Sequence, residues 1–216
     1  QPTKTAAAWA LAKVGISVNP ALYPRRTGSG PEGMVAPILK LIDDADNELQ
    51  QFEGSMALCN LATVPELRDK IVALHGWRVL QMALTSNNDM VQRAALETMS
   101  NLVAHPSVAE KFAEATSTEM KIFVSFCSAD DVKAQIAATG ALATLADEPQ
   151  IGAAIIGAKG LEPFTEIALL AEEPALLHRA AVALQRLLGS ALDLVVGRPG
   201  EEQPDHSMLT LGALTV

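Results

Sequence analysis

The sequence predicts an all-α protein, a solenoid of stacked helical repeats. Composition is the first observation behind this prediction: Ala and Leu dominate, and only 4% of residues are aromatic. Such a composition favours helix over strand and a core of small aliphatic side chains. The second observation is a short phrase that returns at a nearly constant spacing. The third is that Pro and Gly fall at matching places within each period.

A phrase with an Asn between apolar residues marks the period. In ALCNLA (57–62) and TMSNLV (98–103) the two Asn residues lie 41 residues apart. Thr144 and Arg186 occupy the same place 43 and 42 residues further on, and Lys13 fits the frame with a longer first step of 47. A period of roughly 40–47 residues is typical of armadillo and HEAT repeats.

Each period is predicted to hold three helices. Long helices are expected at 47–63, 88–104, 131–146 and 174–189. Shorter helices, each after a Pro suited to a first helical position, are expected at 66–74, 107–115 and 150–158. Third helices are expected at 77–84, 118–127 and 161–170, with Gly76 and Gly160 as left-handed caps before two of them. Three helices per unit is the armadillo pattern, so we predict a right-handed armadillo-repeat superhelical solenoid.

We expect residues 1–190 to form one solenoid of about four to five units. A long loop at 19–33, with three prolines and three glycines, explains the longer first step. The GxGxxG match at 28–33 has no strand before it, as a dinucleotide site requires, so we assign it to this loop. Residues 191–216 are expected to be a linker ending in a truncated helix. Because the chain begins with Gln, we expect it to be a piece of a longer protein.

Charge and cysteine usage exclude several classes of protein. The net charge of −9 argues against nucleic acid or an anionic membrane as a partner. No apolar run is long enough to span a membrane, and no secretion signal opens the chain. Cys59 and Cys127 lack any CxxC or Cys/His spacing. We therefore expect two unbridged thiols in a reducing, cytoplasmic compartment.

The sequence contains no pattern that predicts catalysis. The four His residues are scattered, which predicts no metal site. Acidic pairs fall at turns between helices or at helix N-termini, where carboxylates complement the helix dipole. No Ser or Cys stands in a nucleophile-elbow context. We expect no catalytic residue, no metal and no cofactor, and thus no enzyme.

The recurring Asn is the candidate binding feature. In solenoids the last helices of successive units line the concave face. The predicted groove residues there are Glu53, Ala57, Asn60, Thr98, Asn101, Thr144 and Arg186. An Asn in this position offers a donor and an acceptor to the backbone of an extended peptide. The alternative, equally weighted, is a hydrogen bond between repeats, because a buried amide needs a partner.

Longer phrases resemble a known family. The stretches AAAWALAKVGISVNP (6–20) and FEGSMALCNLA (52–62) are similar to the UCS domain, the myosin-specific chaperone module of the UNC-45/Cro1/She4 type. VQRAA (91–95) and LHRAAVAL (177–184) support the resemblance. It covers about residues 5–190 and weakens in the third block, where Thr144 replaces the Asn.

The resemblance implies a non-enzymatic chaperone domain whose concave groove binds the myosin motor domain and assists its folding and assembly. It also implies client contacts in the loop at Tyr23, Arg25 and Arg26, although charged loop residues are usually just solvated. Family members often carry a tetratricopeptide domain for Hsp90 or Hsp70. This sequence contains no tetratricopeptide pattern, so Hsp90 or Hsp70 is expected as a partner only through domains absent from this chain.

Two other binding functions use the same repeat architecture. Nuclear-import adaptors carry a Trp four residues before each groove Asn, whereas this chain has Met56 and Glu97 there, which counts against import of basic signals. The stronger alternative is a generic armadillo scaffold that binds another protein through its concave groove.

Overall fold

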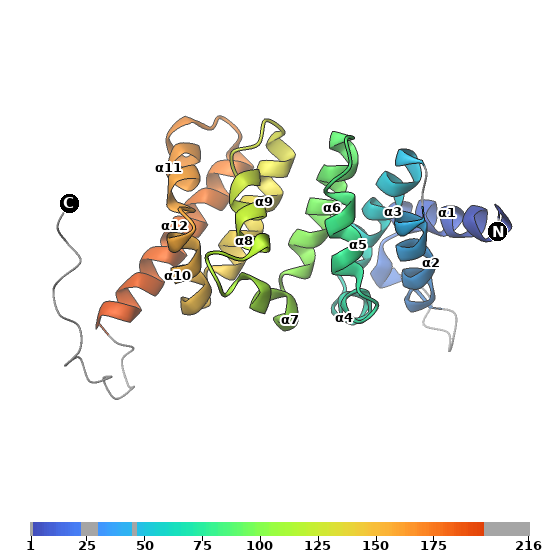
Figure 1. The fold of residues 1–216 in the computed structure, drawn as a ribbon, viewed down its shortest axis with the longest axis horizontal. Coiled ribbons are helices and arrows are strands. Elements are labelled where there is room, and N and C mark those ends of the chain that lie inside the picture. Colours follow the sequence, from blue (N-terminus) through green and yellow to red (C-terminus); the bar gives the residue numbers. More distant parts are fainter. Residues whose placement is uncertain (1, 23–29, 45–46, 197–216) are drawn as a thin grey trace.

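The computed structural model describes residues 2–22, 30–44 and 47–196, and every regular element in these ranges is a helix (Figure 1). In chain order they are α1 (Pro2–Ser17), the 3₁₀ turn η1 (Pro20–Leu22), α2 (Glu32–Asp43), α3 (Glu48–Leu61), α4 (Pro65–Ala73), α5 (Gly76–Ala83), α6 (Asp89–Leu102), α7 (Pro106–Ala109), the 3₁₀ turn η2 (Glu110–Phe112), α8 (Thr118–Phe126), α9 (Val132–Leu145), α10 (Pro149–Gly157), α11 (Leu161–Leu170) and α12 (Pro174–Val196). The prediction of an all-α solenoid is confirmed.

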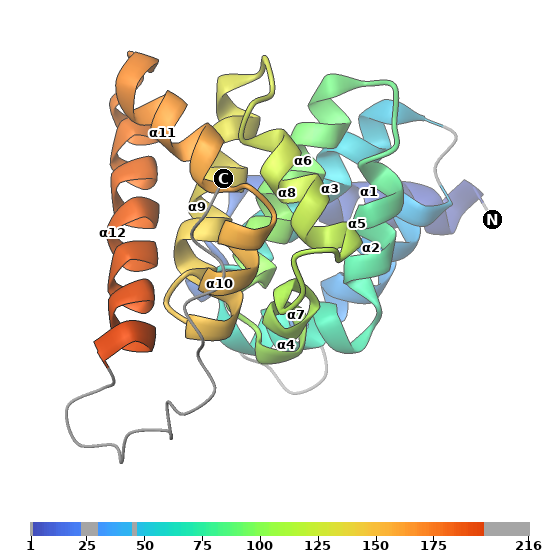
Figure 2. The same ribbon diagram turned by 60° about the vertical axis from the view of Figure 1, so that its left-hand side comes forward.

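The helices follow the predicted units. Three complete units are α4–α6, α7–α9 and α10–α12, and α2 and α3 precede them. The last helices, α1, α3, α6, α9 and α12, each contact the next in the series. They run in this order along the long axis of the molecule, from α1 at one end to α12 at the other (Figures 1 and 2). We call the exposed side of these five helices the groove face.

Local sequence explains where the helices begin. The side chains of Asn47, Asn88 and Asp131 accept hydrogen bonds from the first turns of α3, α6 and α9. Such caps satisfy backbone N–H groups that lack a partner within the helix. Pro65, Pro106 and Pro149 begin α4, α7 and α10, as predicted.

An aromatic cluster joins the unit α4–α6 to the unit α7–α9. Trp77 stacks on Phe123 with ring centroids 6.3 Å apart, and Phe112 meets both rings edge-on at 6.0 and 5.1 Å. All three side chains are buried. The single helix predicted at 107–115 is instead α7 followed by η2, and the tighter winding of η2 accompanies the burial of Phe112.

Two glycines expected to be left-handed caps have another role. The residues with positive φ are their predecessors, His75 at 59° and Lys159 at 65°. A Cβ on Gly76 would lie 2.5 Å from Cγ2 of Ile71 and 2.7 Å from its carbonyl oxygen. The short helix turns so closely into the next one that only Gly fits after the left-handed residue. The prediction of Gly76 and Gly160 as the left-handed residues is therefore wrong.

Replacing His75 by Gly is expected to raise the free energy of unfolding by up to about 1 kcal/mol, because Gly adopts positive φ without the strain of a Cβ. Thermal unfolding monitored by circular dichroism measures the change. Arg78→Gly, in the regular helix α5, is the matched control and should destabilise by about 1 kcal/mol. A loss of stability in His75→Gly equal to that of the control would contradict the prediction.

Two helix boundaries differ from those predicted. α2 begins at Glu32, two residues before Met34, and α12 continues to Val196, beyond Gly189. Residues 191–196 belong to the predicted linker, but they hold no Pro or Gly and are compatible with helix. Despite the length of α12, none of the helices described is sufficiently long and apolar to cross a bilayer.

Candidate functional site

Asn60 caps the end of the preceding unit. Its Nδ2 donates to the carbonyl oxygens of Gly15 at 3.1 Å and Ile16 at 3.0 Å. Both carbonyls belong to the last turn of α1, where no backbone N–H of the helix remains to bond them. The amide therefore fixes the end of α1 from the surface of α3.

The same contact recurs along the groove face. Asn101 on α6 donates to the carbonyl oxygen of Cys59 in the last turn of α3 at 3.1 Å. Arg186 on α12 donates to the carbonyl oxygen of Ala143 in the last turn of α9 at 2.7 Å, and its Nε lies 3.0 Å from a carboxylate oxygen of Asp147. Hydrogen bonds between repeats are thus formed. In each of them, a side chain on one last helix donates to the C-terminal end of the last helix of the unit before it.

Thr144 interrupts this series. Its hydroxyl donates to the carbonyl oxygen of Gly140 in its own helix at 2.9 Å. Within the described part of the chain, this shorter side chain makes no hydrogen bond to the end of α6. The longer amides at the same position on α3 and α6 do reach the preceding last helix. The position that carries Asn on α3 and α6 therefore provides no cap from α9 to the end of α6 among the described residues.

Two predicted groove residues lie beneath the groove face. Ala57 and Thr98 are both 0% exposed, and the Thr98 hydroxyl donates to the carbonyl oxygens of Ser55 at 2.8 Å and Ala94 at 2.7 Å. Their placement on a partner-contacting surface is therefore wrong. Helical spacing identifies a stripe, but adjacent last helices bury its edges on both sides.

Glu53 takes part in a cluster that sequence reasoning missed. Its carboxylate accepts a hydrogen bond from Nε1 of Trp9 and lies 3.9 Å from Nζ of Lys13. The Lys13 ammonium also lies 4.8 Å from the centroid of the Trp9 ring, within cation–π range. Trp9 stands four residues before Lys13, so counting back from the first repeat position would have found it. The predicted loop contacts Tyr23, Arg25 and Arg26 fall outside the described residues.

A hollow of about 360 Å³ lies on the groove face where the series is interrupted. Its lining comes from the last helices of consecutive units: Cys59, Glu97, Ser100, Asn101, Lys133, Ile136, Ala137, Gly140, Ala141, Thr144 and Arg179. Burial raises the pKa of Glu97, against the opposing charges of Arg93 and Lys133. Burial, with the charge of Glu97, also raises the pKa of Cys59 to about 11, so this thiol is neutral at physiological pH.

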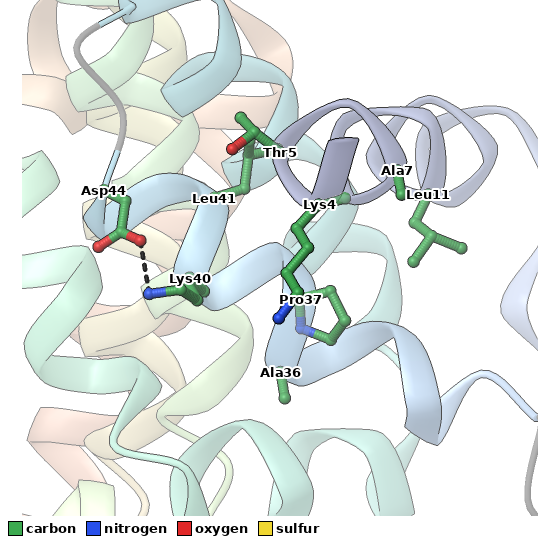
Figure 3. A pocket seen from close by; sticks show the side chains of 10 residues that line it. Lys4, Thr5, Ala7, Leu11, Ala36, Pro37, Lys40, Leu41 and Asp44 are labelled. Carbon is green, nitrogen blue, oxygen red and sulfur yellow. Dashed lines mark ion pairs between the residues drawn. The ribbon is translucent and has the colours of Figure 1, made fainter. Parts of the chain in front are cut away.

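A second hollow, at the N-terminal end of the solenoid, has a more apolar lining. This hollow of about 440 Å³ lies between α1 and α2 and is lined mostly by apolar groups, among them Leu11, Pro37 and Leu41 (Figure 3). At its edge Lys40 pairs with Asp44 at 2.6 Å. Within the ranges described, no three His, Cys, Asp or Glu side chains converge in a way that would hold a metal ion.

The chain is similar to known proteins in both sequence and structure. No model of a protein family matches it. It is 35% identical to human unc-45 homolog B over 144 residues, 66% of this chain and 15% of the human protein. It is 30% identical to Ring assembly protein 3 of Schizosaccharomyces pombe over 148 residues, 63% of this chain and 20% of that protein. The structure of UNC-45 from Drosophila melanogaster superposes with a TM-score of 0.79 and 26% identity over 89% of this chain and 24% of that one. This chain is an armadillo-repeat relative of UNC-45.

The resemblance to the UCS family is thereby confirmed. Two further structures share the fold of this UNC-45 relative. One is an UNC-45 chaperone with features described as critical for binding and folding muscle myosin, at a TM-score of 0.77 and 20% identity over 89% of this chain and 22% of that one. The other is a computationally designed armadillo repeat protein for modular peptide recognition. It superposes with a TM-score of 0.69 and 18% identity over 84% of this chain and 74% of the designed one. The chain spans 15–20% of the length of the curated relatives above.

Proposed function

We propose that this chain is a chaperone domain that binds a myosin motor domain through the groove face and assists its folding and assembly. The observation that carries the proposal is its likeness to UNC-45 in both sequence and fold. An UNC-45 chaperone of the same fold is described as binding and folding muscle myosin. The unpaired thiols Cys59 and Cys127 support a cytoplasmic place for this activity.

The groove face suits capture without chemistry. Its polar side chains are fixed by contacts between units, so they are presented on a rigid surface. In the described part of the chain, Nδ2 of Asn60 and of Asn101 is used in capping, and no donor contacts either Oδ1. These acceptors are available to the N–H groups of an extended client segment, whatever its side chains. The mechanism we propose is binding of exposed client segments, protection from aggregation and release on folding, with no nucleotide turnover.

The test is protection of a myosin motor domain from aggregation on heating, followed by light scattering. An unrelated globular protein serves as the control client. We expect this chain to suppress scattering of the motor domain and to have a much smaller effect on the control. Failure with both clients would contradict the proposal, and equal protection of both would favour a generic scaffold.

A pair of matched variants locates the binding surface. Ser100→Trp fills the hollow on the groove face, whereas Ser125→Trp places the same side chain on an exposed position of α8. Only the first is expected to reduce protection of the motor domain. Equal activity of both variants would place binding elsewhere on the molecule.

A further inference from the structure

The hollow between α6, α9 and α12 contains a cation with no acidic partner. Within residues 2–22, 30–44 and 47–196 Arg179 forms no ion pair, although it projects from α12 into the lining of the hollow. The nearby arginines are paired, Arg93 with Asp131 at 3.2 Å and Arg186 with Asp147 at 3.0 Å. The Arg179 side chain is exposed at the mouth of the hollow, so its guanidinium is open to a partner from solution.

Gly140 makes room for this guanidinium. A Cβ at residue 140 would lie 1.8 Å from Nη1 of Arg179, 2.9 Å from Cζ and 3.2 Å from Cδ. The side chain of Arg179 therefore lies directly against the backbone of α9, where any other residue would displace it. Gly140 is in the middle of α9, a position where Gly weakens a helix relative to Ala. The position of the guanidinium is maintained at that cost to the helix.

The charges of the hollow favour an anion. Arg179 and Lys133 contribute two positive charges and Glu97 one negative charge, which leaves a single positive excess. Burial raises the pKa of Glu97, and the charges of Arg93 and Lys133 act against that rise, so the charge of Lys133 is partly compensated by this carboxyl. Arg179 has no such partner among the described residues, and its planar fork matches a carboxylate.

The surroundings favour a peptide as the source of that carboxylate. Asn101 lines the same hollow, and its Oδ1 receives no hydrogen bond in the described part of the chain, so it suits a backbone N–H. Thr144 lines the hollow too, and its hydroxyl is turned to the carbonyl oxygen of Gly140 in its own helix. We propose that the hollow binds the carboxylate of a Glu or Asp side chain in an extended segment of the protein client, with Arg179 as its partner. This inference rests on the proposed function and specifies what the groove face recognises.

The test uses an array of overlapping peptides from a myosin motor domain and from an unrelated globular protein. Each peptide is also synthesised with every Glu replaced by Gln and every Asp by Asn. The array is probed with the full chain, and dissociation constants of the best peptides are measured by fluorescence anisotropy. We expect acidic peptides to bind about ten-fold more tightly than their amide counterparts, the difference typical of a charged hydrogen-bonded pair.

Two variants remove the carboxylate site by different routes. Arg179→Gln removes the charge, and Gly140→Ala displaces the guanidinium while leaving it charged. Both should abolish the ten-fold preference, and Gly140→Ala should do so without lowering the melting temperature, because only the far end of a flexible side chain must move. The controls Arg78→Gln, on the exposed side of α5, and Gly33→Ala, where a Cβ meets nothing within 4 Å, should keep the preference.

The outcomes separate this inference from the proposed function. Equal binding of acidic and amide peptides by the unmodified chain, no peptide binding at all, or a preference retained in folded Arg179→Gln would overturn the carboxylate site. Motor-domain protection that persists in that case would leave the proposed function standing. A preference for acidic peptides found only among those of the unrelated protein would support the site and count against myosin as the client.

Discussion

Replacing Phe123 by Ala is expected to lower the free energy of unfolding by about 3–5 kcal/mol, the range for removing a fully buried aromatic ring. Phe123 is 0% exposed and contacts both Trp77 and Phe112. Its loss leaves a cavity between two units and removes two ring contacts. Because a solenoid is stabilised by contacts between neighbouring units, we also expect the single unfolding transition to separate into two.

Thermal and urea unfolding, followed by circular dichroism and by the fluorescence of Trp9 and Trp77, measure both effects. Leu169→Ala is the control, since the Leu169 side chain is 76% exposed and its loss should change stability by no more than about 0.5 kcal/mol. A loss below about 1 kcal/mol for Phe123→Ala would show that the aromatic cluster does not join the units.

Replacing both Asn60 and Asn101 by Ala is expected to lower the free energy of unfolding by about 1–3 kcal/mol for each site, the range for leaving a buried polar group without its partner. Each substitution leaves the last carbonyls of a preceding helix uncapped. The two sites bond different helices, so their effects should be nearly additive.

This double substitution separates the two roles considered for the Asn residues. Motor-domain binding is measured at a temperature where the variant remains folded, and Asn87→Ala, at an exposed position between α5 and α6, is the control. A large loss of stability identifies the amides as caps between units. Weakened binding with nearly unchanged stability would identify them as client ligands instead and would contradict the capping role.

The repeat architecture could be predicted because its signals are local. The Pro residues that begin α4, α7 and α10 reflect rules that act within a few residues. The short phrase around Asn60 returns around Asn101, so a period of local signals identifies the repeat. The likeness to UNC-45 was likewise visible in short phrases. The repeated phrases and the Pro and Gly residues between them therefore predicted the units and most of their boundaries.

The site was predicted less well because its contacts join residues about 40 apart in sequence. Spacing alone placed Ala57 on the surface, whereas packing of the adjacent last helices buries it completely. Helix propensity gives no reason for Gly140, whose role depends on a side chain of the next unit. The direction of the Asn60 bond also depends on where α1 ends relative to α3.

The backward direction of the caps has a consequence for synthesis on the ribosome. α1 is complete once Ser17 is made, but the amide that caps its Gly15 carbonyl lies 45 residues downstream. At about 5–20 residues per second, translation needs about 2–9 s to cover that distance. The same holds for two later helices. The end of α3 is capped by Asn101, 42 residues after the Cys59 carbonyl, and the end of α9 by Arg186, 43 residues after the Ala143 carbonyl. During synthesis, the most recent of these helices therefore has an uncapped C-terminal end until the next last helix is made. A pause in translation leaves that unit as the part of the nascent chain most exposed to proteases and to misfolding.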